Sequence, residues 1–137
     1  MNCLKAFTQI SEIDRIREFL KNCLESCEMS EDEYYWIELS VVEICINIIR
    51  YAYPEQDGDF SISVWQEGRN ICVQIKDQGI PFNPKEAKSP VLEEIIKTER
   101  KGGFGIHLAR KLMDEFEYTR KEGQNILFLK KNISTTC

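Results

Sequence analysis

The sequence predicts an α+β fold, a two-layer α/β sandwich in which helices cover one face of a mostly antiparallel mixed sheet. Helical patterns and alternating strands come in blocks, without the strict strand–helix alternation that indicates a parallel sheet. The length of 137 residues suits one domain, 1–137. Apolar residues make up 42% of the chain and charged residues 30%, which is the balance of a globular protein.

The N-terminal part predicts a strand and two helices. Residues 5–10 form a short strand, and Ser11 with Asp14 resembles a capping box that opens a helix with a continuous apolar stripe. Ser30 and Glu33 form a second capping box for a helix that runs to about residue 51, where proline and an Asp-Gly pair stop it.

The remainder predicts two hairpins and two further helices. The first hairpin turns at Glu67–Gly68 and the second at Glu122–Gly123. A Ser-Pro pair starts a short helix, and a glycine-rich loop leads into a longer one. The predicted strands and the short helix cover residues 60–65, 71–76, 116–121, 125–131 and 89–97.

Composition and spacing exclude several classes of protein. A net charge of −5 argues against direct nucleic-acid binding, which needs a surplus of positive charge. No apolar run is long enough to span a bilayer and no signal peptide is present, so we expect a cytoplasmic protein without membrane attachment. The six cysteines contain no CxxC pair and His107 is the sole histidine, so neither a zinc site nor a Ser-His-Asp triad is predicted.

The second helix carries a polar stripe on an otherwise apolar surface. Ser40, Glu43, Asn47 and Arg50 recur at spacings of three and four, so they share one face. A buried carboxylate is costly unless it has partners or meets water. Two interpretations fit the stripe equally well: an internal Glu43–Asn47 hydrogen bond, or a cleft in which Glu43 is a base and Asn47 binds a hard cation.

The strand at 71–76 supplies an independent hint. Its inward row of apolar residues continues, by alternation, to Asp77, and Gly79 follows two positions later. A carboxylate at the end of such a row needs hydrogen-bond donors, and a glycine lets a flat group approach the backbone. An ordinary turn aspartate is the alternative.

The glycine-rich run at 102–105 precedes a predicted helix. Backbone N–H groups at such a position attract anions, and Arg100 and Lys101 lie beside it. The run lacks the endings of a Walker A loop and the spacing of a dinucleotide fingerprint. A flexible loop is therefore the alternative at this point.

Taken in order, the three stretches resemble the Bergerat-type ATP-binding fold shared by gyrase-type ATPases, heat-shock chaperones and histidine kinases. Within it, E-I-C-I-N-I-I-R-Y-A-Y-P (43–54), D-Q-G-I-P-F-N-P (77–84) and G-G-F-G-I-H-L-A (102–109) resemble the anti-sigma factor serine kinases, the switch-protein kinase family. The resemblance covers nearly the whole chain. It implies that the chain uses ATP with Mg²⁺.

On this resemblance, the first motif supplies the catalytic groups. Glu43 would take the proton from a substrate serine, Asn47 would bind the Mg²⁺ ion that bridges the phosphates, and Arg50 would face the same pocket. Arg100, in the lid, would touch the γ-phosphate. Phosphoryl transfer needs such charge neutralisation and positioning more than covalent chemistry.

The other two motifs would bind the nucleotide. Asp77 would accept a hydrogen bond from the adenine amino group and Gly79 would make room for the ring. Pro81 stands where the wider superfamily has a glycine, and D-x-G-x-P-F resembles a subgroup pattern. The threonine common near adenine in the closing hairpin is missing, and Gln124 and Asn125 occupy that neighbourhood. The remaining expected nucleotide contacts are Pro81, Phe82, Gly102, Gly103, Phe104 and Gly105, with Gly103 and Gly105 holding phosphate through their backbone.

The resemblance implies an ATP-dependent serine/threonine-protein kinase that acts as an anti-sigma factor and regulates transcription. It would phosphorylate a small anti-sigma factor antagonist of the STAS type, sequester a sigma factor or similar regulator, and act as a homodimer. Two alternatives remain at this point. One is a nucleotide-dependent protein-binding module without phosphotransfer, and the other is a detached histidine-kinase catalytic domain.

Overall fold

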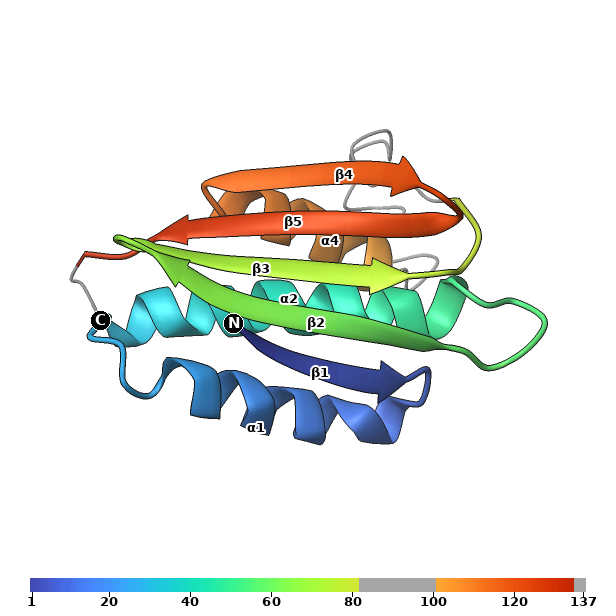
Figure 1. The fold of residues 1–137 in the computed structure, drawn as a ribbon, viewed down its shortest axis with the longest axis horizontal. Coiled ribbons are helices and arrows are strands. Elements are labelled where there is room, and N and C mark those ends of the chain that lie inside the picture. Colours follow the sequence, from blue (N-terminus) through green and yellow to red (C-terminus); the bar gives the residue numbers. More distant parts are fainter. Residues whose placement is uncertain (82–100, 135–137) are drawn as a thin grey trace.

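The structure, a computed structural model, describes the backbone of residues 1–81 and 101–134 and the side chains of residues 1–81 and 106–134. Helices and strands form two layers, with the helices packed on one face of a single sheet (Figure 1). The elements in chain order are β1 (Asn2–Phe7), a 3-10 turn (Ile10–Glu12), α1 (Ile13–Leu24), α2 (Glu31–Tyr51), β2 (Asp59–Glu67), β3 (Asn70–Asp77), α4 (Lys101–Leu112), β4 (Glu115–Lys121) and β5 (Gln124–Asn132).

The predicted two-layer α+β sandwich is confirmed, with one correction to the sheet. Its strand order is β1-β2-β3-β5-β4, and all four pairings between the described strands are antiparallel, so this part of the chain forms an antiparallel sheet and not a mixed one. The reason lies in the connections. Two tight hairpins make β2–β3 and β4–β5 antiparallel, and β1 and β5 then enter beside strands that run in the opposite direction.

The hairpin turns show why these strands pair in this register. Glu122 and Gly123 have φ values of 52° and 77°, the left-handed pair that a two-residue hairpin requires, at the predicted position. The first hairpin turns one residue later than predicted, at Gly68–Arg69, because Gly68 (φ 60°) occupies the first left-handed position of the turn.

The two predicted capping boxes have different outcomes. At α2, Ser30 Oγ accepts from Glu33 N at 3.0 Å and Glu33 Oε1 accepts from Ser30 N at 2.8 Å, which confirms the box. The box at Ser11 is wrong, because the chain enters α1 through a 3-10 turn. Its N-cap residue is Glu12, already helical, so no extended residue is available to cap the helix. The first strand also begins earlier than predicted, at Asn2.

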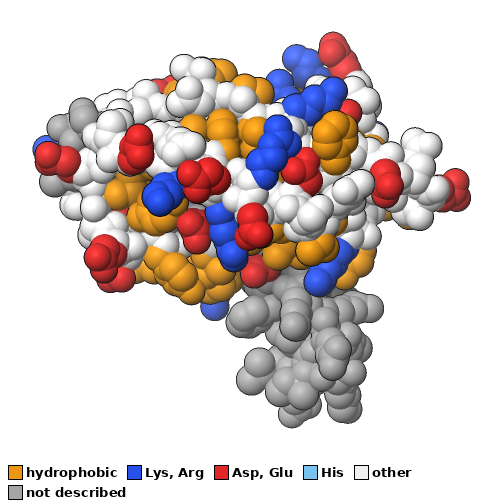
Figure 2. Space-filling view, turned by 90° about the horizontal axis from the view of Figure 1, so that it is seen from below, with side chains coloured by type: hydrophobic (Ala, Val, Ile, Leu, Met, Phe, Trp, Pro, Cys, Tyr) orange, Lys and Arg blue, Asp and Glu red, His pale blue; other side chains and the backbone are white. Residues whose placement is uncertain are grey.

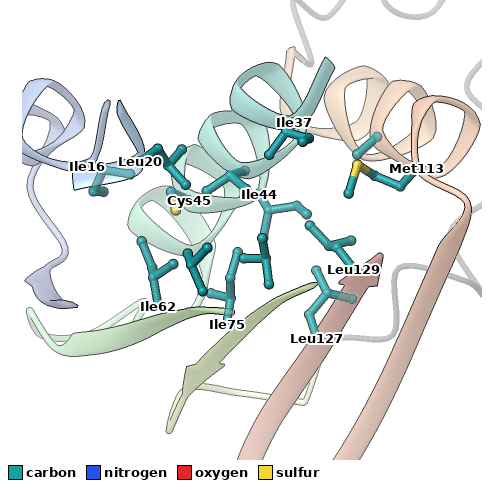
Figure 3. Packing of buried hydrophobic residues seen from close by; sticks show 14 of the residues in the cluster. Ile16, Leu20, Ile37, Ile44, Cys45, Ile62, Ile75, Met113, Leu127 and Leu129 are labelled. Carbon is teal, nitrogen blue, oxygen red and sulfur yellow. The ribbon is translucent and has the colours of Figure 1, made fainter. Parts of the chain in front are cut away.

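The core lies between the sheet and the helices. Figure 3 shows Ile44 and Cys45 of α2 facing the inward row of the sheet, including Ile62, Ile75 and Leu127. Because α2 is apolar on most of its surface, it packs against the sheet, α1 and α4 together. This central position of α2 places its polar side chains near the inner face of the sheet.

The outer surface carries mixed charges. Figure 2 shows acidic, basic and apolar side chains interspersed on the face seen from below. Among the described residues, Lys5 pairs with Asp59 at 3.3 Å, but an exposed pair of this kind adds little stability. None of the helices in the described part of the chain has the length and apolar character needed to cross a membrane.

Candidate functional site

A cavity of about 60 Å³ opens between the C-terminal half of α2 and the inner face of the sheet. Its walls are mostly apolar, with a few polar side chains that converge on it, the usual composition of a ligand site. The volume admits only a few water molecules, so a nucleotide would have to widen it. The lining residues are Ile44, Asn47, Ile48, Tyr51, Ala52, Ile75, Asp77, Ile80, Ile106, Tyr118, Asn125 and Leu127.

Asp77 provides the carboxylate of this cavity. It ends β3 on the inward face and is only 6% exposed. Its Oδ1 atom accepts hydrogen bonds from Gly79 N at 2.8 Å and from Asn125 Nδ2 at 2.9 Å. Its Oδ2 atom accepts no hydrogen bond from any described residue. The carboxylate therefore keeps one acceptor for a ligand that carries an N–H group.

Gly79 is required by the protein itself. A Cβ atom at this position would lie 2.3 Å from Ala52 O, at the end of α2, and Ile80 N donates to the same carbonyl at 2.9 Å. This close approach to the backbone at the end of α2 fixes the segment after Asp77 against the helix end. The room that Gly79 would leave for a ring stays a prediction.

Tyr53 also holds the segment that follows Asp77, through hydrogen bonds of its hydroxyl group. Its hydroxyl accepts from Gln78 N at 2.8 Å and donates to Asp59 O at 2.6 Å. Burial raises the pKa of this phenol, so the hydroxyl stays protonated and keeps its role as donor. The turn that follows Asp77 is therefore held at both of its edges.

The polar stripe of α2 divides into two parts. Asn47 lines the cavity, is 8% exposed, and makes no hydrogen bond to another described residue. Glu43 is half-buried and Arg50 is exposed, and neither lines the cavity. At about 100° per residue, these two lie roughly 40–60° around the helix from Asn47, on the same flank. The structure thus brings Asn47, but not Arg50, together with Asp77.

The glycine-rich run lies inside a helix, not in a loop before it. Helix α4 begins at Lys101, so Gly102, Gly103 and Gly105 belong to its first turns. Glycine disfavours a helix by about 1 kcal/mol per residue, which is why the sequence predicts a loop. Packing against α2 outweighs that preference, because Ile106 and Ala109 are buried and Ile106 also lines the cavity. The N-terminal part of α4 is therefore adjacent to the cavity.

The other expectations have different outcomes. Phe82, Arg100 and the predicted helix 89–97 lie outside the described residues. Pro81 is exposed and borders a separate surface groove with Arg120, not the cavity.

Asn125 is a buried polar residue to which the sequence assigned no contact. It is 7% exposed and pairs directly with Asp77 across β3 and β5. A signal was available in the alternation of the last strand. Asn125 begins the inward row that continues with Leu127 and Leu129, just as Asp77 ends the inward row of β3. Two polar residues facing each other at the ends of two apolar rows indicate a polar site at that edge of the core.

Two solved structures share this architecture. The crystal structure of the RsbU and RsbW domains of Rv1364c from Mycobacterium tuberculosis aligns with the whole chain at a TM-score of 0.65 and 15% identity, over 34% of that protein. Acinetobacter baumannii histidine kinase AdeS aligns with 98% of the chain at a TM-score of 0.54 and 13% identity, over 70% of its length. At these identities the likeness establishes the fold alone, a two-layer α+β sandwich.

The sequence places the chain within a family. Residues 8–131 match the histidine kinase-like ATPase domain, and the chain belongs to that family. It is 26% identical over 103 residues to serine-protein kinase RsbW of Bacillus mycoides, and 29% identical over 96 residues to serine/threonine-protein kinase BtrW of Bordetella bronchiseptica. These matches cover 72% and 69% of this chain, and 64% and 68% of the respective relatives. The match thus spans less than two thirds of RsbW.

Proposed function

We propose that the chain is an ATP-dependent protein serine kinase. Its substrate would be a small antagonist protein of the STAS type, and it would also sequester a sigma factor or a similar regulator. It would act in the cytoplasm as a homodimer. Membership of the ATPase family and similarity to proteins named serine-protein kinase support this proposal.

One observation carries the proposal: Asn47 and Asp77 leave their polar groups open in the same cavity. Asp77 contributes one unused carboxylate oxygen, and Asn47 contributes an amide that no described residue engages. A purine with an exocyclic amino group offers the donor that Asp77 lacks. Asn47 lines the same cavity from α2, and the phosphates that follow the base and sugar of a nucleotide would lie beside it.

The residues present fit a magnesium nucleotide. The Asn47 amide oxygen is the type of hard ligand that Mg²⁺ accepts. The described residues contain no group of three His, Cys, Asp or Glu side chains able to hold a metal by themselves. Mg²⁺ commonly takes one or two protein ligands and completes its shell with substrate phosphates and water. When bound, it would neutralise charge that develops on the phosphates.

The protein would bind the phosphates with backbone and cationic groups. The glycines of α4 lie in its first turns, and the N-terminal end of a helix offers backbone N–H groups and the positive end of the helix dipole to an anion. Glycine lets the backbone approach an anion closely. Arg100 would add a charge at the γ-phosphate, and Arg50 would contribute from the flank of α2.

Glu43 would act as the general base. In the transfer, the serine Oγ atom of the partner attacks the γ-phosphorus, the bond to the oxygen between the β- and γ-phosphates breaks, and ADP leaves. The serine proton passes to the Glu43 carboxylate. Glu43 lies one turn before Asn47 and is half-buried, so it is near the cavity while remaining reachable from outside.

The test uses Glu43→Gln with Mg-ATP and a candidate antagonist protein, measured by mass spectrometry of phosphoserine. We expect ADP affinity to stay within about threefold and phosphoserine formation to fall by about 100-fold or more. The control is Glu38→Gln, also half-buried on α2, whose side chain contacts Tyr34 and Arg17 and does not line the cavity. Unchanged phosphorylation in the Glu43 variant would remove this residue from the proposed role.

A second candidate is a nucleotide-dependent binding module without phosphotransfer. The observation that favours it is the position of the charged part of the stripe, because Glu43 does not line the cavity whereas Asn47 and Asp77 do. In that case the wild-type protein would bind ADP and ATP and would leave every associated protein unphosphorylated.

A further inference from the structure

Asn125 lies near the start of β5, in the hairpin formed by β4 and β5, and lines the cavity together with Asp77. Its side-chain amide contacts four groups. Nδ2 donates to Asp77 Oδ1 at 2.9 Å and to Ile80 O at 2.8 Å. Oδ1 accepts from Tyr118 Oη at 2.5 Å and from Arg120 Nη1 at 3.2 Å. Arg120 Nη1 also donates to Gly79 O at 2.8 Å.

These four contacts use the complete hydrogen-bonding capacity of the amide. An asparagine side chain has two N–H donors and two acceptor lone pairs, and all four are occupied within the protein. Asn125 therefore has nothing left with which to bind a ligand. Its influence on a ligand must pass through the groups that it holds.

The contacts also fix which way the amide points. Arg120 can only donate, while Ile80 O and the Asp77 carboxylate oxygen only accept. If the amide were flipped, its N–H groups would face the guanidinium and its oxygen would face two acceptors. One orientation is therefore strongly favoured, and it directs an N–H group at Asp77 Oδ1.

The effect on Asp77 is to distinguish its two oxygens. Oδ1 receives one donor from the backbone at Gly79 and one from Asn125, so its lone pairs are used. A rotation of the carboxylate would break both bonds. Asp77 lines the cavity, and its Oδ2 atom is the acceptor to which no described residue donates.

We infer that Asn125 is a positioning residue that sets the base selectivity of the cavity by holding Asp77 Oδ2 toward a 6-aminopurine. The inference rests on the proposed nucleotide site and adds the origin of its selectivity. A base with a carbonyl oxygen at position 6 places an acceptor against the fixed carboxylate oxygen and is rejected. Tyr118 and Arg120 act one step further out, since they orient Asn125.

The experiment compares ADP with IDP, whose position 6 carries a carbonyl oxygen, by calorimetric titration. The wild-type protein should bind ADP about 10- to 100-fold more tightly than IDP, the range expected for a hydrogen bond to a charged group. Asn125→Leu keeps the volume and removes all four contacts, and it should reduce that ratio to about threefold or less. Asn125→Thr keeps one hydroxyl donor and should restore part of the ratio.

The control is Thr119→Ala, an exposed neighbour on β4 between Tyr118 and Arg120, which should leave the ratio unchanged. A uniform loss of affinity for ADP and IDP, with the ratio kept, would indicate a purely structural role and overturn the inference. If Asn125→Leu fails to fold, as judged by circular dichroism, the ratio in Asn125→Thr decides in the same way.

The outcomes separate this inference from the proposed function. Equal binding of ADP and IDP by the wild type would leave a nucleotide site in place and overturn the selectivity assigned to Asn125. Binding of neither nucleotide would overturn the proposed function, and the inference with it.

Discussion

Two buried carboxylates, one at the start of α2 and one at the end of β3, show how a structural group differs from a functional one. Glu33, at the start of α2, is 9% exposed, and Asp77, at the end of β3, is 6% exposed. Glu33 Oε1 accepts from Ser30 N at 2.8 Å and Ser134 Oγ at 2.9 Å, and its Oε2 accepts from Ser134 N at 2.8 Å. Both of its oxygens are thus engaged.

Asp77 receives two donors on one oxygen, and no described residue donates to the other. Burial is nearly the same for the two residues, so burial does not distinguish them. The distinguishing feature is an acceptor left open toward a cavity. Glu33 joins the cap of α2 to the C-terminal segment, whereas Asp77 has one acceptor available for a ligand.

The largest expected effect is on nucleotide binding by Asp77→Asn. The change keeps the size of the side chain and the acceptor at Oδ1, but it replaces the open oxygen with an amide that donates. We expect ADP affinity to fall by about 100-fold, because a donor then faces the amino group of the base. Calorimetry measures the loss, and Glu33→Gln serves as the matched control. Similar losses in the two variants would contradict the contrast between these carboxylates.

Gly79→Ala should destabilise the fold that presents Asp77. The added Cβ atom would lie 2.3 Å from Ala52 O, a backbone atom that cannot rotate away. Relief requires the segment after β3 to move from α2, and we expect a loss of about 2–3 kcal/mol in unfolding free energy. Urea denaturation tests this, with the exposed neighbour Gln78→Ala as control. A loss below about 0.5 kcal/mol would show that the backbone at the end of α2 moves to accept the added Cβ atom at little energetic cost.

The contribution of the ionised Glu33 side chain to stability should depend on pH. The hydrogen bond from Ser30 N, and those from Ser134, lower the pKa of Glu33 from its ordinary value of 4.5. Because the folded-state pKa is lower than the unfolded one, the stabilisation is complete above about pH 4.5 and is lost as the pH falls through the folded-state pKa.

Glu33→Gln should therefore lower the free energy of unfolding by about 1–2 kcal/mol near pH 7, and by progressively less in acid. Urea denaturation at a series of pH values measures this difference. The variant should bind ADP like the wild type near neutral pH. A loss of unfolding free energy that does not change with pH would show that the charge of Glu33 does not stabilise the N-terminal end of α2.

The smallest expected effect is a gain in stability from Ser40→Ala. Ser40 is 1% exposed, and its Oγ atom has no hydrogen-bond partner among the described residues. Removing an unsatisfied buried hydroxyl, and placing alanine in a helix, should stabilise the protein by about 0.5–1 kcal/mol. Ser30→Ala is the contrasting variant and should cost about 1 kcal/mol, because it removes the α2 cap. Equal losses in both variants would mean that Ser40 has a polar role in the core.

The sequence predicts the layers of this fold well because short-range signals define most of its elements. The capping box at Ser30, the alternation of the strands and the turn at Glu122–Gly123 each act over a few residues. The errors lie where packing overrides local preference. The glycine run joins α4 through contacts with α2, and α1 begins through a 3-10 turn that its sequence does not encode locally.

The site is predicted less completely for the same reason. Asn47 and Asp77 were identified from periodicity, which places them on the correct faces. The sequence does not predict the contact between Asn125 and Asp77, because that contact depends on strand register: β5 must pair with β3 before the two side chains meet. The need for Gly79 arises from the end of α2, a contact between segments that are distant in sequence.

The most direct measurement is a crystal structure of the protein with ADP bound. The account predicts that the 6-amino group of the adenine lies within hydrogen-bonding distance of Asp77 Oδ2, with Asn125 still bonded to Oδ1 and the phosphates directed toward Asn47 and the N-terminal end of α4. A nucleotide bound elsewhere, or an adenine whose amino group points away from Asp77, would contradict it.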